Sequence, residues 1–353
     1  MLDPVFFDAR YIRVGHHDGI SRFSAGLCEA LSKKTKVIAI VSDTRQLEKL
    51  PNGIEHVLLN DPTKPFAELL IAKKLNKLGA KLVFSPMQTM GTWFRKYRLV
   101  LTLHDLIYYA HPTPPPSFSW PIRLGWRLFH LTYIPQRLML NGADAIVTVS
   151  QTTKSLIAKH RLTRKPVSVV YNAGSGTKQL AHTKPNKSLI YMGSFMEYKN
   201  VECLIDSLST LTDYQLELLS RISPERQAQL ESRAGESAKR IVFHNGVSDE
   251  KYHQVLSSAF ALVSASKDEG FGIPVIEAME QGTPAIVSDI EIFREIGGEA
   301  ASYFDPDSPE QLAKRVLELS QNWNSASESA IQQAKKFNWE ASAEALLTAL
   351  EAL

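Results

Sequence analysis

Apolar residues follow two alternating patterns along the chain. Short apolar runs are followed by stretches in which apolar positions lie three or four residues apart, a spacing that places them on one face of a helix. Repeated alternation of strands and helices is typical of an α/β fold with parallel sheets. The runs that predict strands are 5–8, 37–41, 82–85, 99–103, 143–150, 167–171, 189–194, 216–219, 260–265 and 303–304, and the stretch 241–250 predicts a strand, a turn and a helix start.

Helical spacing follows several of these runs. The first predicted helix spans 19–31, with apolar side chains at Phe23, Leu27 and Leu31. Further helices are predicted at 201–208, 275–280, 309–319 and from 326 to the C-terminus.

The length of 353 residues suits two α/β domains of roughly 170 residues each. With 44% hydrophobic and 22% charged residues, the composition is that of a globular protein. We find no apolar run long enough to span a membrane and no leader pattern at the start, so we expect a cytoplasmic protein. Cys28 and Cys203 lie in helical patterns without the spacing of metal ligands, which predicts free thiols.

Charge is unevenly distributed although the net charge is only +3. Residues 1–172 contain 24 Lys and Arg against 11 Asp and Glu, and the remainder contains 16 against 26. The basic half could attract an anionic acceptor or the anionic face of a membrane. Attraction between the two domains, together with solvated lysines, is the alternative explanation. No nucleic-acid-binding motif accompanies the charge, so we expect no nucleic-acid partner.

Residues 268–279 carry the most specific chemistry. They join an apolar run to a predicted helix through Gly270 and Gly272, and Pro274 fits the first turn of that helix. A helix start with outward amides favours an anion. Glu269 and Glu277 could accept hydrogen bonds from hydroxyl groups around it, and phosphate with a polyol suggests a sugar nucleotide. An ordinary strand-to-helix turn with two acidic residues is the alternative.

These residues resemble a known family. Glu269, the sequence Gly-Phe-Gly-x-Pro at 270–274, and Glu277 resemble the donor site of the family-four retaining glycosyltransferases. The likeness continues through 278–288 and 293–298. It implies the GT-B fold, an α/β architecture of two Rossmann-like parallel-sheet domains facing across a cleft. We place the first domain at 1–174, a linker at 175–187, the donor-binding domain at 188–335, and a final helix at 336–353 that crosses back to the first domain.

The resemblance implies donor-binding residues in the second domain. Lys199 matches a lysine that contacts the diphosphate, and Val247 matches the place where the backbone meets the nucleobase. Many members have an arginine where this chain has Ser194, so we take Arg221 as the candidate that replaces it. Glu269 would bind the donor hexose and act in catalysis with Lys199, and Glu277 would bind the ribose. The remaining predicted contacts around the diphosphate are Gly270, Phe271, Gly272, Ile273 and Val275.

The first domain contributes three candidates through the same resemblance. Gly19 matches a glycine whose amide approaches the donor phosphate, and Arg22 follows it. Asp18 stands where the family usually has another glycine. His104 follows the predicted strand 99–103, and in the family a histidine at this position faces the donor sugar and is a catalytic candidate.

Residues 108–140 form the least ordinary stretch, and residues 112–133 are its centre. Prolines between 112 and 116 precede Trp120, Arg123, Trp126 and Arg127, which are spaced as on one helix. This helix could contact a membrane surface, form an acceptor wall, or pack in the core.

The resemblance implies a metal-independent hexosyltransferase without a cofactor, acting on a glycan, glycolipid or other small acceptor. We expect GDP-mannose as donor, because mannosyltransferases are common among similar chains, with UDP-glucose as the alternative. A sugar-nucleotide epimerase of this fold and a non-catalytic pair of domains that binds a nucleotide or polysaccharide are the rival functions. We expect cytoplasmic localisation, with contact at the inner face of the membrane through the first domain. The sequence Asp305-Pro306-Asp307 resembles a metal–diphosphate motif of another fold, but Ser308 after it predicts a helix cap.

Overall fold

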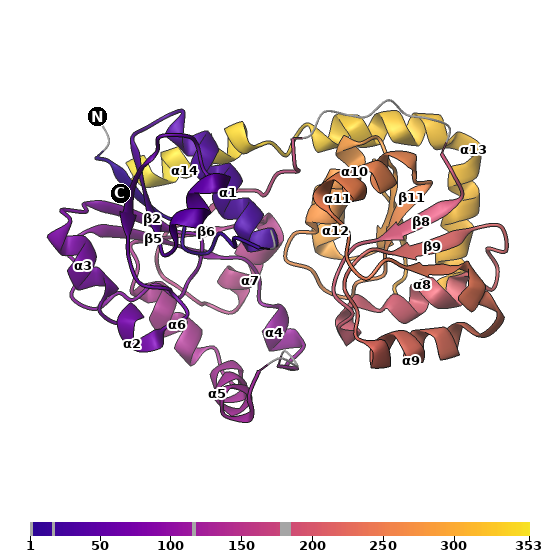
Figure 1. Cartoon of the computed structure of the whole chain (residues 1–353), viewed down its shortest axis with the longest axis horizontal. Helices are drawn as coiled ribbons and strands as arrows, with labels where there is room; N and C mark the ends of the chain where they lie inside the picture. Colours follow the sequence, from indigo (N-terminus) through magenta and orange to yellow (C-terminus); the bar gives the residue numbers. More distant parts are fainter. Residues whose placement is uncertain (1–2, 16–17, 115–117, 177–184) are drawn as a thin grey trace. The chain divides into compact units, whose positions relative to one another are not determined.

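The computed structural model describes residues 3–15, 18–114, 118–176 and 185–353. The chain forms two compact units, Met1–Ala173 together with Asn338–Leu353, and Gly174–Phe337 (Figure 1). Of the predicted linker 175–187, residues 177–184 lie outside the described residues, as do residues 115–117 of the proline-rich stretch. In the described part of the chain, no helix has the length and hydropathy needed to cross a bilayer.

The first unit contains a seven-stranded parallel sheet in the order β3-β2-β1-β4-β5-β6-β7. Its strands are β1 (Val5–Asp8), β2 (Val37–Val41), β3 (Glu55–Leu58), β4 (Leu82–Ser85), β5 (Arg98–Leu103), β6 (Ala145–Thr148) and β7 (Val167–Val169). The central strands β1 and β4 are buried along their whole length, because helices cover both faces of the sheet.

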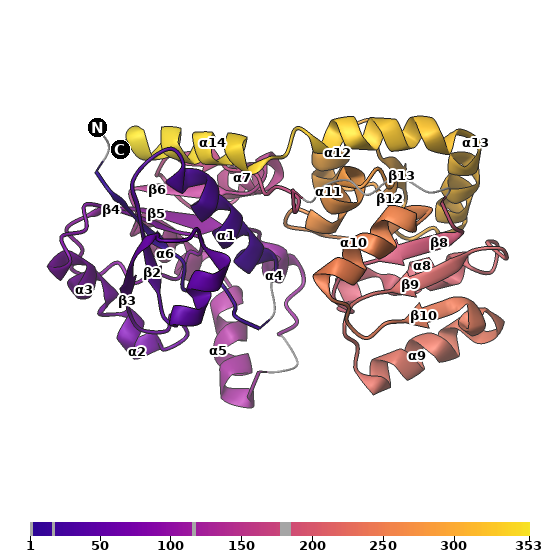
Figure 2. The same ribbon diagram turned by 45° about the horizontal axis from the view of Figure 1, so that its top comes forward.

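Helices of the first unit lie on both sides of its sheet (Figures 1 and 2). They are α1 (Gly19–Ser32), η1 (Thr44–Lys49), α2 (Pro65–Glu68), α3 (Ile71–Lys77), α4 (Ile107–Ala110), α5 (Trp120–His130), α6 (Ile134–Asn141) and α7 (Gln151–Lys159). Leu75 of α3 and Leu140 of α6 share a buried cluster with Phe6 of β1.

The second unit contains a six-stranded parallel sheet in the order β10-β9-β8-β11-β12-β13. Its strands are β8 (Ser188–Tyr191), β9 (Gln215–Leu218), β10 (Ile241–Phe243), β11 (Ala261–Ser264), β12 (Ala285–Ser288) and β13 (Ser302–Phe304). The helices are η2 (Glu197–Lys199), α8 (Val201–Ser207), α9 (Pro224–Ala234), η3 (Gly235–Arg240), α10 (Asp249–Ser258), α11 (Ile273–Glu280), α12 (Glu291–Gly297) and α13 (Pro309–Ala334). The predicted α/β class with parallel sheets is confirmed.

The last helix, α14 (Trp339–Glu351), belongs to the first unit. The Trp339 indole packs on Gly26 of α1, where an added Cβ would lie 2.3 Å from the indole Cε2, and on the ring of Phe23. The Ser342 hydroxyl donates to the Tyr171 carbonyl at 2.7 Å. Of the helical pattern from 326 onward, the first part ends α13, and the Asn338 side chain accepts from the Ala341 amide and starts α14.

Candidate functional site

Four strand ends of the second unit bring predicted site residues together. Strands β10, β9, β8 and β11 are parallel neighbours, so the loops that follow them leave the same edge of the sheet. Lys199 follows β8, Arg221 follows β9, Val247 follows β10 and Glu269 follows β11. Residues separated by as much as 70 positions in sequence therefore share one edge.

Lys199 and Glu269 form an ion pair at this edge. Their side chains are 12% and 16% exposed, so solvent reaches a pair that is otherwise enclosed. The Ser266 hydroxyl donates to the same Glu269 oxygen at 3.1 Å, and the Lys199 ammonium lies 5.1 Å from the centre of the Tyr198 ring. Both charged groups are held in place while remaining within reach of a ligand.

Gly272 shapes the start of α11. Its φ of +90° is unfavourable for other residues, and an added Cβ would lie 2.9 Å from the Phe293 ring. Gly272 is the N-cap and has no side chain to cap the helix, which begins at Ile273. The Val275 amide donates to the Gly272 carbonyl at 2.9 Å, so a phosphate oxygen would have to share or displace that bond.

Gly270 and Phe271 precede this helix start. The Phe271 side chain is buried, and its ring meets the Phe337 ring edge-on at 5.7 Å between centroids. The ring therefore anchors the loop in the second unit, and any ligand contact of Phe271 would come from its backbone.

Glu277 and Glu280 are one helical turn apart on α11. Glu277 is buried, and Glu280 packs on Gly174, where an added Cβ would lie 2.2 Å from the Glu280 carboxyl carbon. Burial, and then the charge of Glu277, raise the pKa of Glu280 to about 7. Glu280 was not among the predicted site residues, although two acids three residues apart on a predicted helix were a signal that could have identified it.

Arg221 lies beside the turn that contains Val247. Gly246 has a φ of +99°, and an added Cβ there would lie 3.0 Å from the Arg221 Cγ. The Ser194 carbonyl accepts from the buried Tyr191 hydroxyl at 2.6 Å, while Arg221 is exposed. The fold thus places the predicted replacement cation next to the turn expected to meet the nucleobase.

In the first unit, Asp18 caps α1. Its carboxylate accepts from the Ser21 amide at 2.9 Å and pairs with Arg13 at 2.8 Å. Gly19 is the exposed first residue of the helix, and Arg22 is half-buried one turn later. The Asp18 carboxylate therefore occupies part of the start of α1, where the resemblance predicts a donor phosphate.

His104 follows β5 and is partly buried. Its Nε2 lies 2.7 Å from the Pro86 carbonyl oxygen and must carry the proton to donate to it, which leaves Nδ1 as an acceptor in the neutral ring. Burial lowers the pKa of His104, which favours that neutral form. The Phe23 ring meets the imidazole edge-on at 5.1 Å and fixes its orientation.

His104 also lines a largely apolar pocket of about 810 Å³ in the first unit. Helix α5 forms one wall, with Trp126 and His130 facing Tyr108. None of the α5 residues is buried, so the core-helix interpretation of this stretch is wrong. This pocket therefore joins His104, a predicted site residue, to the inner side of α5.

Two family models match the chain in succession. The model described as "Glycosyltransferase Family 4" matches residues 17–173, and the model "Glycosyl transferases group 1" matches residues 176–337. Together they span most of both units.

The chain belongs to the family-4 type of glycosyltransferases.

Known proteins of this family extend the likeness. The chain is 29% identical over 226 residues to "O-antigen chain mannosyltransferase RfbU" of Salmonella typhimurium, an alignment that covers 63% of this chain and 60% of that protein. The chain thus matches 60% of the length of this curated relative.

Two solved structures show the fold. Sucrose-phosphate synthase (tll1590) from Thermosynechococcus elongatus aligns with a TM-score of 0.75 at 17% identity, covering 99% of this chain and 98% of that one. Anabaena Alr3699/HepE in complex with UDP-glucose aligns with a TM-score of 0.71 at 16% identity, covering 99% and 100%. The GT-B fold predicted for this glycosyltransferase is confirmed.

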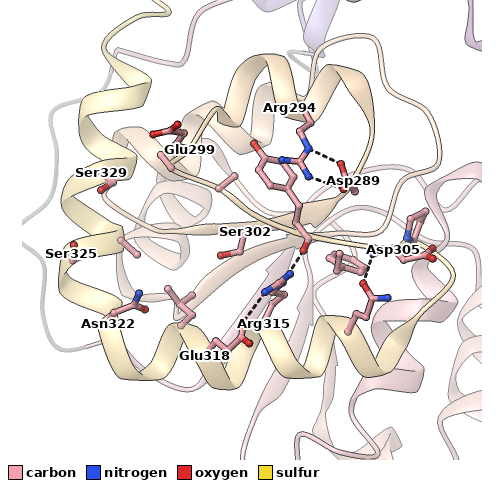
Figure 3. Close-up of a pocket in the computed structure, with 18 residues that line it drawn as sticks. Asp289, Arg294, Glu299, Ser302, Asp305, Arg315, Glu318, Asn322, Ser325 and Ser329 are labelled. Atoms are coloured by element: carbon pink, nitrogen blue, oxygen red, sulfur yellow. Dashed lines mark hydrogen bonds and ion pairs between the residues drawn. The ribbon is translucent and has the colours of Figure 1, made fainter.

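A second large pocket of this glycosyltransferase, about 800 Å³, contains none of the predicted site residues (Figure 3). It lies between β13 and α13, and its arginines are engaged with protein groups: Arg294 with Asp289, and Arg315 with Glu318 and the Tyr303 carbonyl.

Asp305 borders this pocket but belongs to the cap of α13. The Asp305 carboxylate accepts from the Asp307 amide at 2.9 Å, and the Ser308 hydroxyl accepts from the Gln311 amide. The capping interpretation is confirmed. Within the residues that the structure describes, no three His, Cys, Asp or Glu side chains are grouped to hold a metal ion.

Proposed function

We propose that the chain transfers a hexose from a nucleotide sugar to a glycan acceptor. The observation that carries this proposal is the meeting of Lys199, Glu269 and the start of α11 at one edge of the second sheet, in a chain of a glycosyltransferase family. The likeness to RfbU, an O-antigen chain mannosyltransferase, supports mannose as the hexose, and we propose GDP-mannose as its donor. HepE, solved with UDP-glucose, supports UDP-glucose as the alternative donor.

In this proposal the second unit binds the donor. The Lys199 ammonium and the amides at the start of α11 hold the diphosphate, and the helix dipole stabilises the negative charge that develops on the leaving group. Glu269 binds hexose hydroxyls and Glu277 the ribose. Arg221 supplies a second cation, and the backbone at Val247 meets the base. Because Lys199 is paired with Glu269, the diphosphate competes with that carboxylate for the ammonium.

We further propose transfer with retention of configuration and without a metal ion. The acceptor hydroxyl attacks the anomeric carbon from the face that the phosphate leaves, and the leaving phosphate takes the hydroxyl proton. Positioning and electrostatics then supply the rate enhancement. Activity that survives excess EDTA and a product with the donor's anomeric configuration by NMR are the expected results.

The first experiment is a thermal-shift panel with GDP-mannose, UDP-glucose and ADP-glucose. A ligand at ~100 times its Kd adds about 2.7 kcal/mol to the free energy of unfolding, which is easily measured as a rise in Tm. Consumption of the stabilising donor is then measured with and without glycan acceptors. Donor turnover that yields free nucleotide and an epimerised sugar without any acceptor would identify an epimerase instead.

Variants then test the residues. Lys199→Ala and Glu277→Gln should weaken donor binding by about 1.5–3 kcal/mol each, the value of one charge-assisted contact. Glu269→Gln should lower turnover more than donor affinity. Lys187→Ala is the control, because it removes a lysine paired with Asp213 on an exposed part of the same unit. Wild-type kinetics in all three site variants would refute the assignment. His104, Gly19 and Arg22 are the corresponding candidates of the first unit, to be tested with Ala at each position in the same assay.

A further inference from the structure

Helix α5 has apolar side chains on two opposite sides. One side lines the pocket that includes His104, and Ile122, Trp126 and Phe129 belong to it. The opposite side carries apolar residues spaced three or four positions apart, namely Trp120, Leu124, Leu128 and, at the C-cap, Leu131. A short helix that is apolar on both sides is normally enclosed by protein or lipid, yet no residue of α5 is buried.

The outward side is strongly exposed. Trp120 is 77% exposed, Leu128 58% and Leu131 73%. The exposed apolar side chains continue along α6 with Ile134 and Leu138. We call this set the α5–α6 outer face: Trp120, Leu124, Leu128, Leu131, Ile134 and Leu138. Both ribbon views show α5 at the periphery of the first unit, away from its sheet (Figures 1 and 2).

The sequence segment that carries this face is predominantly basic. Residues 106–165 contain eight basic residues and a single acidic one, Asp144. Asp144 is paired with Arg95, so its charge is compensated. Arg127 and Arg137 are exposed and alternate with the leucines of the outer face. The basic residues are Arg123, Arg127, Arg137, Lys154, Lys159, Arg161, Arg164 and Lys165.

We propose that the α5–α6 outer face docks on the surface of an anionic lipid bilayer. Exposed leucines and a tryptophan supply apolar insertion at the interface, and the surrounding arginines supply attraction to anionic headgroups. A second copy of the chain is a poorer partner, because two such faces would bring basic residues against each other.

Docking through this face has a consequence for the pocket beneath it. The inner side of α5 forms a wall of the pocket that contains His104, and a helix with its side chains is about 10–12 Å across. The membrane would therefore lie one helix diameter from this pocket. The docking itself needs no donor, so it can be tested whether or not the proposed transfer is correct.

The test is co-sedimentation of the full chain with vesicles of phosphatidylcholine alone or mixed with phosphatidylglycerol. We expect binding to the mixed vesicles that weakens as salt rises. Leu124→Gln with Leu128→Gln should weaken it about tenfold per leucine. Arg123→Gln with Arg127→Gln should weaken it about fivefold per arginine.

Matched control variants remove exposed leucines or exposed cations that lie outside the α5–α6 outer face. Leu78→Gln with Leu317→Gln removes two exposed leucines, and Lys33→Gln with Lys36→Gln removes two exposed cations of the first unit. Both control pairs should bind as the unaltered chain does, and all variants should keep its circular dichroism spectrum and Tm.

Three results would overturn the proposal. They are no binding to the mixed vesicles, equal and salt-insensitive binding to phosphatidylcholine alone, and equal loss of binding in the control pairs. A dimer in light scattering that the leucine variant abolishes, without vesicle binding, would show instead that the face joins two copies of the chain.

Discussion

Charged side chains after the strands are buried to different degrees in the two units. In the first unit, Arg10 follows β1 and is buried with Asp8 and Glu68. Its guanidinium donates to both carboxylates at 2.7–3.0 Å and to the Asn60 carbonyl at 3.1 Å, so all of its N–H groups are used. Asp18 and His104 of this unit likewise bond to the backbone of their own unit.

In the second unit, the ion pair at the corresponding edge is less enclosed than the Arg10 cluster. The Lys199–Glu269 pair is reached by solvent, and Glu280 lies near Glu277 with a raised pKa. A saturated ion cluster contributes to architecture, whereas a partly exposed pair and two acids in close proximity can exchange protein partners for a ligand. The comparison favours a structural role for Arg10, and it supports the binding role that we propose for Lys199.

The largest expected effect tests this division directly. Arg10→Met should lower the free energy of unfolding by about 3–5 kcal/mol, because it leaves Asp8 and Glu68 buried without their counter-ion. Lys199→Met should cost less stability than Arg10→Met, because solvent reaches the Glu269 carboxylate that is left behind, but it should impair donor binding. Urea unfolding of both variants measures the difference. Equal losses of stability would remove the distinction between the two clusters.

Glu280 gives the second largest effect, and it depends on pH. Its pKa is about 7 in the folded protein against an ordinary 4.5, so the folded state holds a proton that the unfolded chain has released. The proton on Glu280 contributes fully to the free energy of unfolding below pH ~4.5. This contribution is lost as pH rises toward ~7, which lowers the free energy of unfolding by at most about 3 kcal/mol.

Glu280→Gln should remove this dependence. The variant should match the wild type in acid and be the more stable protein above pH ~7, because a neutral amide pays no cost of ionisation beside Glu277. Urea unfolding across that pH range gives the slope. A slope equal to that of the wild type would mean that folding does not raise the pKa of Glu280.

How much the sequence could predict differs between the units for a physical reason. The second unit's candidates lie in one local pattern, Glu269 to Glu277, or directly after apolar strands. Strand order then brings Lys199 to Glu269 without further information. The α/β fold followed from the same alternation of patterns. Strand β3 was not predicted, because it is an exposed edge strand without an apolar run.

Contacts between distant side chains could not be predicted. The burial of Phe271 against Phe337 and the packing of Glu280 on Gly174 depend on tertiary neighbours that no local spacing encodes. The position of α5 was open for the same reason, since aromatic and apolar spacing fits a core helix as well as an exposed one.

The two sides of α5 provide the third test. Trp126→Ala removes a ring that contacts Tyr108 at 5.2 Å and His130 at 4.1 Å between centroids, and should cost about 1–2 kcal/mol. Leu128→Ala, on the outer face, should stay within about 0.5 kcal/mol of wild type. Thermal unfolding compares them. A larger loss for Leu128 would show that the outer face is covered by protein.

The smallest expected effect concerns the one departure from the family pattern at the start of α1. Asp18→Gly should cost only a few tenths of a kcal/mol in stability, because glycine is itself an acceptable N-cap and the Arg13 partner is exposed. If the Gly19 amide meets the donor phosphate, removing this anion should tighten donor binding by about 0.3–1 kcal/mol, or roughly two- to fivefold. Calorimetric titration with the donor that raises Tm measures the change. Asp43→Gly is the control, because Asp43 also caps a helical turn of the first unit but follows β2 rather than β1. A donor Kd that Asp18→Gly leaves unchanged, or shifts no more than Asp43→Gly does, would show that the first unit's helix start takes no part in donor binding and that the diphosphate is held by the second unit alone.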